Sequence, residues 1–121
     1  MSIKRLEQLP AKANINFVKG DDYLLDVEIT DNEGLPIDFS AWSDERIQVR
    51  NFDDNSILFE EDVNDNLTTT AGGRVTVTLP SSENGNWPDR VKYEVDGTDG
   101  NGNSQSVLRG QIKLEEEIAG N

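Results

Sequence analysis

Residues 23–30, Tyr-Leu-Leu-Asp-Val-Glu-Ile-Thr, carry the pattern that decides the fold. The odd-numbered residues from Tyr23 to Ile29 are all large and apolar, whereas Asp26, Glu28 and Thr30 are polar, and only Leu24 breaks the alternation. Successive side chains of a β-strand point to opposite faces of its sheet. The stretch therefore predicts a strand with one buried face and one face in water.

The same alternation recurs on both sides of this stretch. It predicts further strands at residues 15–17, 45–52, 73–79, 91–95 and 108–114. Clusters of Gly, Asn and Asp separate these runs, and such residues favour turns because they adopt left-handed backbone angles at low cost. Short alternating strands between turn clusters are typical of a sandwich or a barrel. No connection is long enough for a crossover helix, which predicts antiparallel pairing.

Helical signals are confined to two short segments. Residues 3–9 place Ile3, Leu6 and Leu9 on one side before Pro10, which predicts one or two helical turns. Residues 80–83, Pro-Ser-Ser-Glu, predict another short turn.

The length of 121 residues indicates a single domain. We expect an N-terminal arm at residues 1–13, a β-sandwich domain at residues 14–116 and a C-terminal tail at residues 117–121.

The composition excludes most catalytic chemistry. The chain has no cysteine and no histidine, which removes the usual nucleophilic triads and the nitrogen and thiolate ligands of zinc and iron. The glycine-rich residues 97–102 are not followed by Lys-Ser or Lys-Thr, so they predict a hairpin tip and not a phosphate-binding loop. Close carboxylate pairs are expected by chance among 24 acidic residues. We expect no enzyme activity, no catalytic residues, no cofactor and no metal.

The charge balance limits the partners. With 11 basic and 24 acidic residues, the net charge is −13, which disfavours nucleic acid and anionic membranes as partners. No apolar run is long enough to span a membrane, and no apolar stretch follows the N-terminal charges as in a signal peptide. The basic residues Lys4, Arg5 and Lys12 make the N-terminal arm a candidate interface with the acidic body of a neighbour. The alternative is a solvated terminus.

Calcium is the metal that the sequence favours most among those considered. Asp99, Asn101 and Asn103 match the first three ligand positions of an EF-hand loop, but the required glycine and glutamate are missing from later positions. The same spacing at residues 62–66 fails in the same way. A weak calcium site remains one interpretation of these loops, and side chains that bond to their own turns are the other.

Four large aromatic residues have two interpretations each. Trp42 and Trp87 lie outside the clean strand patterns, and Phe52 and Phe59 flank the acidic turn at residues 53–55. Their size suits the ends of a core, and they also suit anchors of a subunit interface. An alternative function, a carbohydrate- or calcium-dependent adhesion module, would use Trp42 or Trp87 and acidic loops to contact a glycan.

Several segments resemble small β-sandwich proteins of tailed bacteriophages. Residues 18–22, Val-Lys-Gly-Asp-Asp, lead into the alternating strand at residues 23–30, and residues 30–40, Thr-Asp-Asn-Glu-Gly-Leu-Pro-Ile-Asp-Phe-Ser, are similar to the Thr-Asp-x-x-Gly-x-Pro-x-Asp segment of these proteins. Residues 47–50, 93–95 and 107–114 resemble three of their strands. The family includes the N-terminal module of phage baseplate upper proteins, and the resemblance covers roughly residues 14–115.

The resemblance implies an all-β, antiparallel Ig-like β-sandwich of about seven to eight strands. It implies a non-enzymatic structural component of a virion, made in the host cytoplasm, that acts as a tail, baseplate or fibre adaptor or as a head decoration. The partners would be other virion proteins, in several symmetry-related copies. No catalytic residue is carried over.

Overall fold

The computed structural model describes residues 4–6, 11–31, 33–62, 67–69 and 72–116, and this part of the chain is mainly β-structure. In order, its elements are β1 (Lys4–Leu6), β2 (Ala11–Lys12), β3 (Ile15–Val18), β4 (Tyr23–Ile29), the 3-10 helix η1 (Phe39–Ala41), β5 (Ser43–Asn51), β6 (Ile57–Asp62), β7 (Leu67–Thr69), β8 (Arg74–Leu79), α1 (Ser81–Asn84), β9 (Arg90–Thr98) and β10 (Ser104–Glu115).

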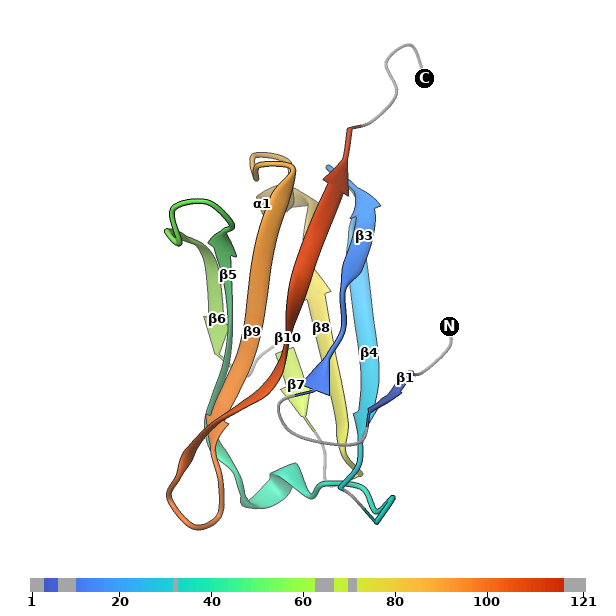
Figure 1. Ribbon diagram of the computed structural model, residues 1–121, viewed down its shortest axis with the longest axis vertical. Helices are drawn as coiled ribbons and strands as arrows, with labels where there is room; N and C mark the ends of the chain where they lie inside the picture. Colours follow the sequence, from blue (N-terminus) through green and yellow to red (C-terminus); the bar gives the residue numbers. More distant parts are fainter. Residues whose placement is uncertain (1–3, 7–10, 32, 63–66, 70–71, 117–121) are drawn as a thin grey trace.

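The strands form two sheets that lie as two layers (Figure 1). The four-stranded sheet has the order β1-β4-β8-β7. The six-stranded sheet has the order β2-β10-β9-β5-β6, and β3 also pairs with β10. Alternate residues of β4, β5, β8 and β9 are buried between the layers in one cluster of apolar side chains. The predicted all-β sandwich is confirmed, and each of the alternating stretches contributes a strand to it.

The expectation of purely antiparallel pairing is wrong for the N-terminal strands. β1 runs parallel to β4, and β2 and β3 both run parallel to β10. Antiparallel pairing was predicted from the short connections between strands that follow one another in the chain, and these parallel pairs join strands that do not. β1 reaches β4 through two strands of the other sheet, and β3 is separated from β10 by most of the chain, so neither parallel pair needs a crossover helix.

The N-terminal arm expected at residues 1–13 belongs in part to the sandwich. Residues 4–6 form a strand in the four-stranded sheet, where a helical turn was expected, and residues 11–12 pair with β10. Ala11 and Ala13 are buried, as are Ile15 and Phe17, so the alternation of buried residues already begins at Ala11. The first strand of the six-stranded sheet therefore begins before residue 14. The rest of the predicted helical segment lies outside the described residues.

The short helix α1 after Pro80 matches the second expected turn. Its last residue, Asn84, forms hydrogen bonds with the turn between β3 and β4. Asn84 is fully buried. Its amide nitrogen donates hydrogen bonds to the carbonyl oxygens of Asp21 (2.8 Å) and Leu79 (3.3 Å), and its side-chain oxygen accepts one from the Gly20 amide (2.7 Å). The turn between β3 and β4 is thereby joined to the end of β8.

Candidate functional site

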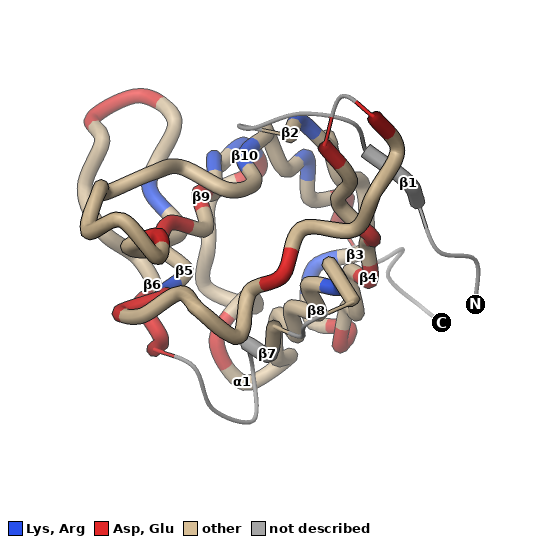
Figure 2. The backbone as a smooth tube through the Cα atoms, turned by 90° about the horizontal axis from the view of Figure 1, so that it is seen from below, with Lys and Arg blue, Asp and Glu red and all other residues tan. Residues whose placement is uncertain are grey.

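The outer face of the six-stranded sheet, which points away from the core, carries most of the basic residues of the chain. Seven of the 11 Lys and Arg residues belong to its strands, whereas acidic residues are spread around the molecule (Figure 2). The cause is the strand period, because the core takes the odd-numbered residues of β5 and β9, so that their even-numbered residues point outward. These seven residues are Lys12, Arg46, Arg50, Arg90, Lys92, Arg109 and Lys113.

Strand register places these cations beside one another. Arg109 lies between Lys12 on β2 and Glu94 on β9. One position further along, Lys92 pairs with Arg50 on β5. Like charges at directly opposed positions repel, so this arrangement costs stability unless another group neutralises it.

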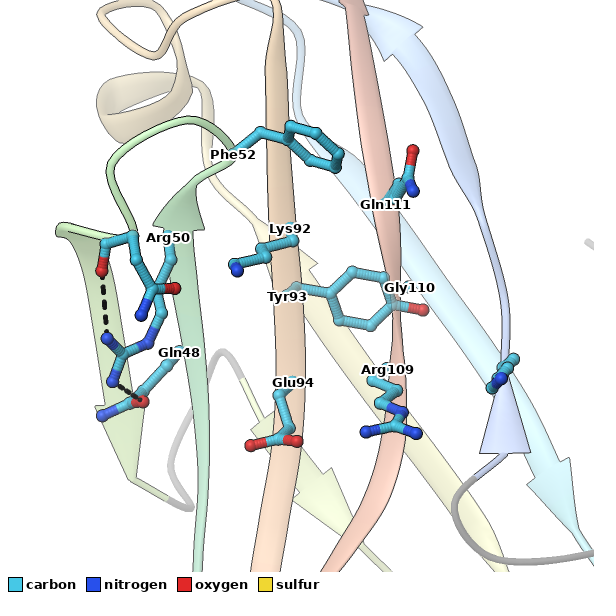
Figure 3. Close-up of a pocket in the computed structure, with 11 residues that line it drawn as sticks. Gln48, Arg50, Phe52, Lys92, Tyr93, Glu94, Arg109, Gly110 and Gln111 are labelled. Atoms are coloured by element: carbon cyan, nitrogen blue, oxygen red, sulfur yellow. Dashed lines mark hydrogen bonds between the residues drawn. The ribbon is translucent and has the colours of Figure 1, made fainter.

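A depression of about 520 Å³ lies at the centre of this cationic region. We call it the basic depression, and its lining includes Lys12, Arg50, Lys92, Arg109, Phe52 and Tyr93. Figure 3 shows that Arg50, Lys92, Tyr93 and Arg109 come from neighbouring strands, and Phe52 lies in the turn that follows β5. Glu94 is the one carboxylate of its lining.

The floor of the basic depression is rigid. Tyr93 lies across Gly110 (Figure 3), and its hydroxyl donates a hydrogen bond of 2.5 Å to the carbonyl oxygen of Ala13. Burial raises the pKa of Tyr93 above its ordinary value. The amide of Ala13 donates to the carbonyl oxygen of Arg109 at 3.0 Å. These bonds fix β2 and β3 against β10 and so position Lys12 and Arg109.

One wall of the basic depression is held by hydrogen bonds. The guanidinium of Arg50 donates to the carbonyl oxygen of Asn55 (3.0 Å) and to the side-chain oxygen of Gln48 (2.9 Å). Gln48 in turn donates to the carboxylate of Glu60. On the upper rim, the guanidinium of Arg90 lies 4.3 Å from the ring centroid of Phe52, in a cation–π contact.

Six of the seven cations of this face have no carboxylate counter-ion in the described part of the chain, Arg46 being the exception. Four of the six, Lys12, Lys92, Arg109 and Lys113, also make no side-chain hydrogen bond there. Other cations are neutralised. Lys19 pairs with Asp89 and Glu116, at 3.0 and 3.1 Å.

The other sheet shows the same neutralisation. Arg74 on β8 makes a two-point contact with Asp26 on β4, whose side chain is almost completely buried. The hydrogen bond from Arg74 holds the pKa of Asp26 below its ordinary value, against the opposing effect of burial. Among the side chains that the structure describes, cations without a counter-ion thus occur on one face, in a chain that has more than twice as many acids as bases.

A second depression, of about 570 Å³, lies toward the other end of the same face and is acidic. Asp44, Asp62, Glu94 and Asp96 line it, together with Arg46. The guanidinium of Arg46 lies 3.7 Å from a carboxylate oxygen of Asp96 and 3.7 Å from one of Glu60. Partial burial raises the pKa of Asp96, although Arg46 acts in the opposite direction.

The structure places the predicted aromatic residues in different environments. Trp87 and Phe59 are buried in the core, with their ring centroids 5.9 Å apart. Trp42 is partly buried and packs edge-on against Phe39, at a centroid distance of 5.1 Å. Phe52 is partly exposed at the rim of the basic depression. Of the four, only Phe52 belongs to the basic depression.

The predicted basic residues are also separated. Lys12 is exposed and lines the basic depression. Lys4 and Arg5 lie on β1 at the edge of the other sheet, and their side chains lie outside the described part of the structure. Arg50, Lys92 and Arg109 were not predicted as site residues from the sequence. The alternation indicated that these side chains point away from the core, but the sequence did not show which strands are neighbours.

The loop considered for calcium uses its oxygens for its own turn. One carboxylate oxygen of Asp99 accepts hydrogen bonds from the amides of Asn101 (2.9 Å) and Asn103 (3.0 Å). The other accepts one from the side chain of Gln105 at 2.5 Å. These bonds lower the pKa of Asp99. Most of the second loop, residues 62–66, lies outside the described residues. No group of three or more acidic side chains within the described ranges is placed to hold a metal ion.

No protein-family model and no curated protein matches the sequence.

None of the helices in the described part of the chain is long and apolar enough to cross a membrane.

The site is therefore defined by charge and shape. The outer face offers cationic side chains, amides and one partly exposed aromatic ring over a stiff sheet. Such a surface can bind a partner that brings carboxylates.

Proposed function

We propose that this protein is a non-enzymatic structural component of a tailed-phage virion, which docks through the outer face of its six-stranded sheet. The resemblance to phage β-sandwich proteins supports the virion setting. The fold supports a scaffold role, because the sheet holds its outward side chains at fixed spacing. The partners would be tail, baseplate, fibre or head subunits, met in several symmetry-related copies inside the bacterial host.

The observation that carries the proposal is the set of cations without a counter-ion. Lys92 and Arg109 lie on adjacent strands of a chain whose net charge is −13. A sequence with so many carboxylates could neutralise them internally, as it does for Lys19 and Arg74. A partner that supplies carboxylates would neutralise them instead, and this would give the contact its orientation.

The range of this attraction also favours a closely docked partner. At physiological ionic strength the screening length is about 8 Å. A partner further away than this is not attracted by the cations of the outer face, and the protein as a whole is acidic. The cations attract a partner only when it lies close to that face. The charge distribution thus disfavours loose binding of nucleic acid or anionic lipid and favours a fitted protein surface.

Replacement of Lys92 and Arg109 by Gln should lower incorporation into particles by about tenfold, because two charged contacts are lost at once. The test uses a phage that lacks this gene and receives the protein from a plasmid. The amount of protein per purified particle is measured by quantitative mass spectrometry.

The matched control is Ser82→Glu with Asn86→Glu, which changes the net charge by the same amount at exposed positions outside this face. This control should be incorporated at the wild-type level. If purified, complete particles contained none of the wild-type protein supplied from the plasmid, the virion role would be contradicted. Normal incorporation of the Lys92→Gln, Arg109→Gln protein would contradict the role of the outer face.

A further inference from the structure

The outward side chains of β9 and β10 change charge in one direction along the strands. Residues paired across these two strands form four rows on the outer face. The first row contains Lys113 and Arg90, and the second contains Gln111 and Lys92. These two rows hold three cations and no carboxylate, so this end of the strand pair is basic.

The remaining two rows complete a charge gradient. The third row pairs Arg109 with Glu94, whose charges offset each other, and the fourth pairs Ser106 with Asp96. The hydroxyl of Ser106 donates a hydrogen bond of 3.0 Å to the carboxylate of Glu94, so these two rows lie on the same face. From the first row to the fourth, the strand pair changes from basic through neutral to acidic.

Three depressions follow one another along these rows. The first, of about 250 Å³, is lined by Lys113, Arg90 and Gln111, among others. Gln111 also lines the basic depression, and Glu94 lines both the basic and the acidic depression. The three depressions are therefore neighbours, and together they extend from the first row to the fourth. A long, narrow ligand fits such a series of concave sites better than a rounded protein surface does.

The spacing of the rows matches the repeat of an extended chain. Successive rows are two residues apart along β9, which corresponds to about 6.7 Å. In an extended segment, alternate side chains point to the same side at this same spacing. A segment that lies along β9 and β10 therefore places one side chain over each row, and about seven residues cover all four rows.

We infer that the outer face binds an extended segment of a partner protein, which lies along β9 and β10 and carries a charge gradient opposite to theirs. Its inward side chains are acidic at the first two rows, uncharged at the third and basic at the fourth. The inference rests on the proposed docking role of the outer face and names the chemistry of the partner. The argument is charge complementarity at a matched spacing.

The fourth row makes the site selective. A uniformly acidic segment would match the first two rows but would then meet Asp96, with Asp44 and Asp62 nearby in the lining of the acidic depression. Arg46 lies beside Asp96 and offsets only part of this charge. A nucleic-acid strand, which carries a phosphate at every step, would be repelled in the same way. A segment whose charge changes sign along its length avoids this repulsion.

Two synthetic peptides with blocked ends test the inference. In the matched peptide, threonine alternates with Glu, Glu, Gln and Lys in that order. The shuffled peptide has the same composition with the order Glu, Lys, Glu, Gln, which fits the gradient in neither direction. The matched peptide should bind at least about fivefold more tightly than the shuffled one. Fluorescence anisotropy of labelled peptides measures both affinities with protein at up to about 1 mM.

Two variants assign the binding to particular rows. Lys92→Gln with Lys113→Gln should weaken binding of the matched peptide by at least about fivefold, because a cation is lost from each of the first two rows. The control Ser82→Glu with Asn86→Glu has the same charge change at exposed positions outside this face, and it should bind as wild type does. Asp96→Asn should remove the preference of the wild type for lysine over glutamate at the fourth inward position, which a third peptide measures.

The outcomes separate this inference from the proposed function. Equal binding of the matched and shuffled peptides, or binding that Lys92→Gln with Lys113→Gln leaves unchanged, would overturn the inference, as would no binding at the highest concentration. In that case the proposed function would stand if incorporation into particles still depended on Lys92 and Arg109, with a folded surface as the partner. Incorporation that does not depend on these two residues contradicts the docking role of the face, whatever the peptides do.

Discussion

Gly110→Ala should lower the free energy of unfolding by about 3 kcal/mol or more, at the upper end of the range for overpacked cores. A Cβ at Gly110 would lie 2.1 Å from the carbonyl oxygen of Ala13 and 3.1 Å from the ring of Tyr93. Backbone cannot yield to a methyl group as a flexible side chain can. Relief requires β2 and β3 to move away from β10, with loss of the hydrogen bond between Tyr93 and Ala13. Urea denaturation followed by tryptophan fluorescence measures the change.

Gly85→Ala is the matched control for this substitution. A Cβ there meets its nearest atom, the carbonyl oxygen of Ser81, at an ordinary distance of 3.7 Å, and Gly85 has a right-handed backbone. Its unfolding curve should stay close to that of wild type. A Gly110→Ala protein as stable as the Gly85→Ala protein would show that the N-terminal strand does not pack against β10 as described.

Asn84→Leu should cost about 2–4 kcal/mol of stability, because it removes two part-buried hydrogen bonds and one buried hydrogen bond to the backbone. Leucine keeps the branching of asparagine but is bulkier, so the loss combines the missing hydrogen bonds with crowding at a buried position. The groups affected are the amide of Gly20 and the carbonyl oxygens of Asp21 and Leu79. Thermal and urea unfolding measure the loss, and hydrogen exchange should show faster exchange of the Gly20 amide.

Asn86→Ala, at an exposed position two residues away, serves as the comparison and should change stability little. If Asn84→Leu were neutral, the amide of Asn84 would not be the group that joins the β3–β4 turn to the end of β8.

The sandwich was predictable because its central strands are buried on one side only. Val91, Tyr93 and Val95 are buried while Lys92 and Glu94 face outward, and this contrast is visible in the sequence. β6 escaped prediction because Ile57, Leu58 and Phe59 are consecutive apolar residues without alternation. It lies at the edge of its sheet, where Ile57 is exposed.

The N-terminal strand escaped for a different reason. Ala11 and Ala13 continue the inward alternation, but alanine is a weak signal of burial. Nothing local in the sequence says that β3 lies beside the last strand of the chain. That pairing depends on which core faces fit together, and period alone does not encode it.

The cationic outer face was only partly predictable for the same reason. The sequence showed that Arg50, Lys92 and Arg109 point away from the core. It did not show that β5, β9 and β10 are adjacent, so the cations could not be assembled into one surface. Lys12 was singled out for the charge of the N-terminal arm, and the structure gives it a different setting beside Arg109. Trp87 and Phe59 had two interpretations, and their position in the core supports the structural one.

Carbodiimide cross-linking of intact particles gives the sharpest test of the outer face, because it joins a lysine to a carboxylate in contact with it. We expect cross-links from Lys12 or Lys92 to carboxylates of another virion protein when the products are digested and sequenced by mass spectrometry. Particles in which this protein is cross-linked only through residues outside the outer face of the six-stranded sheet would contradict the binding role of that face.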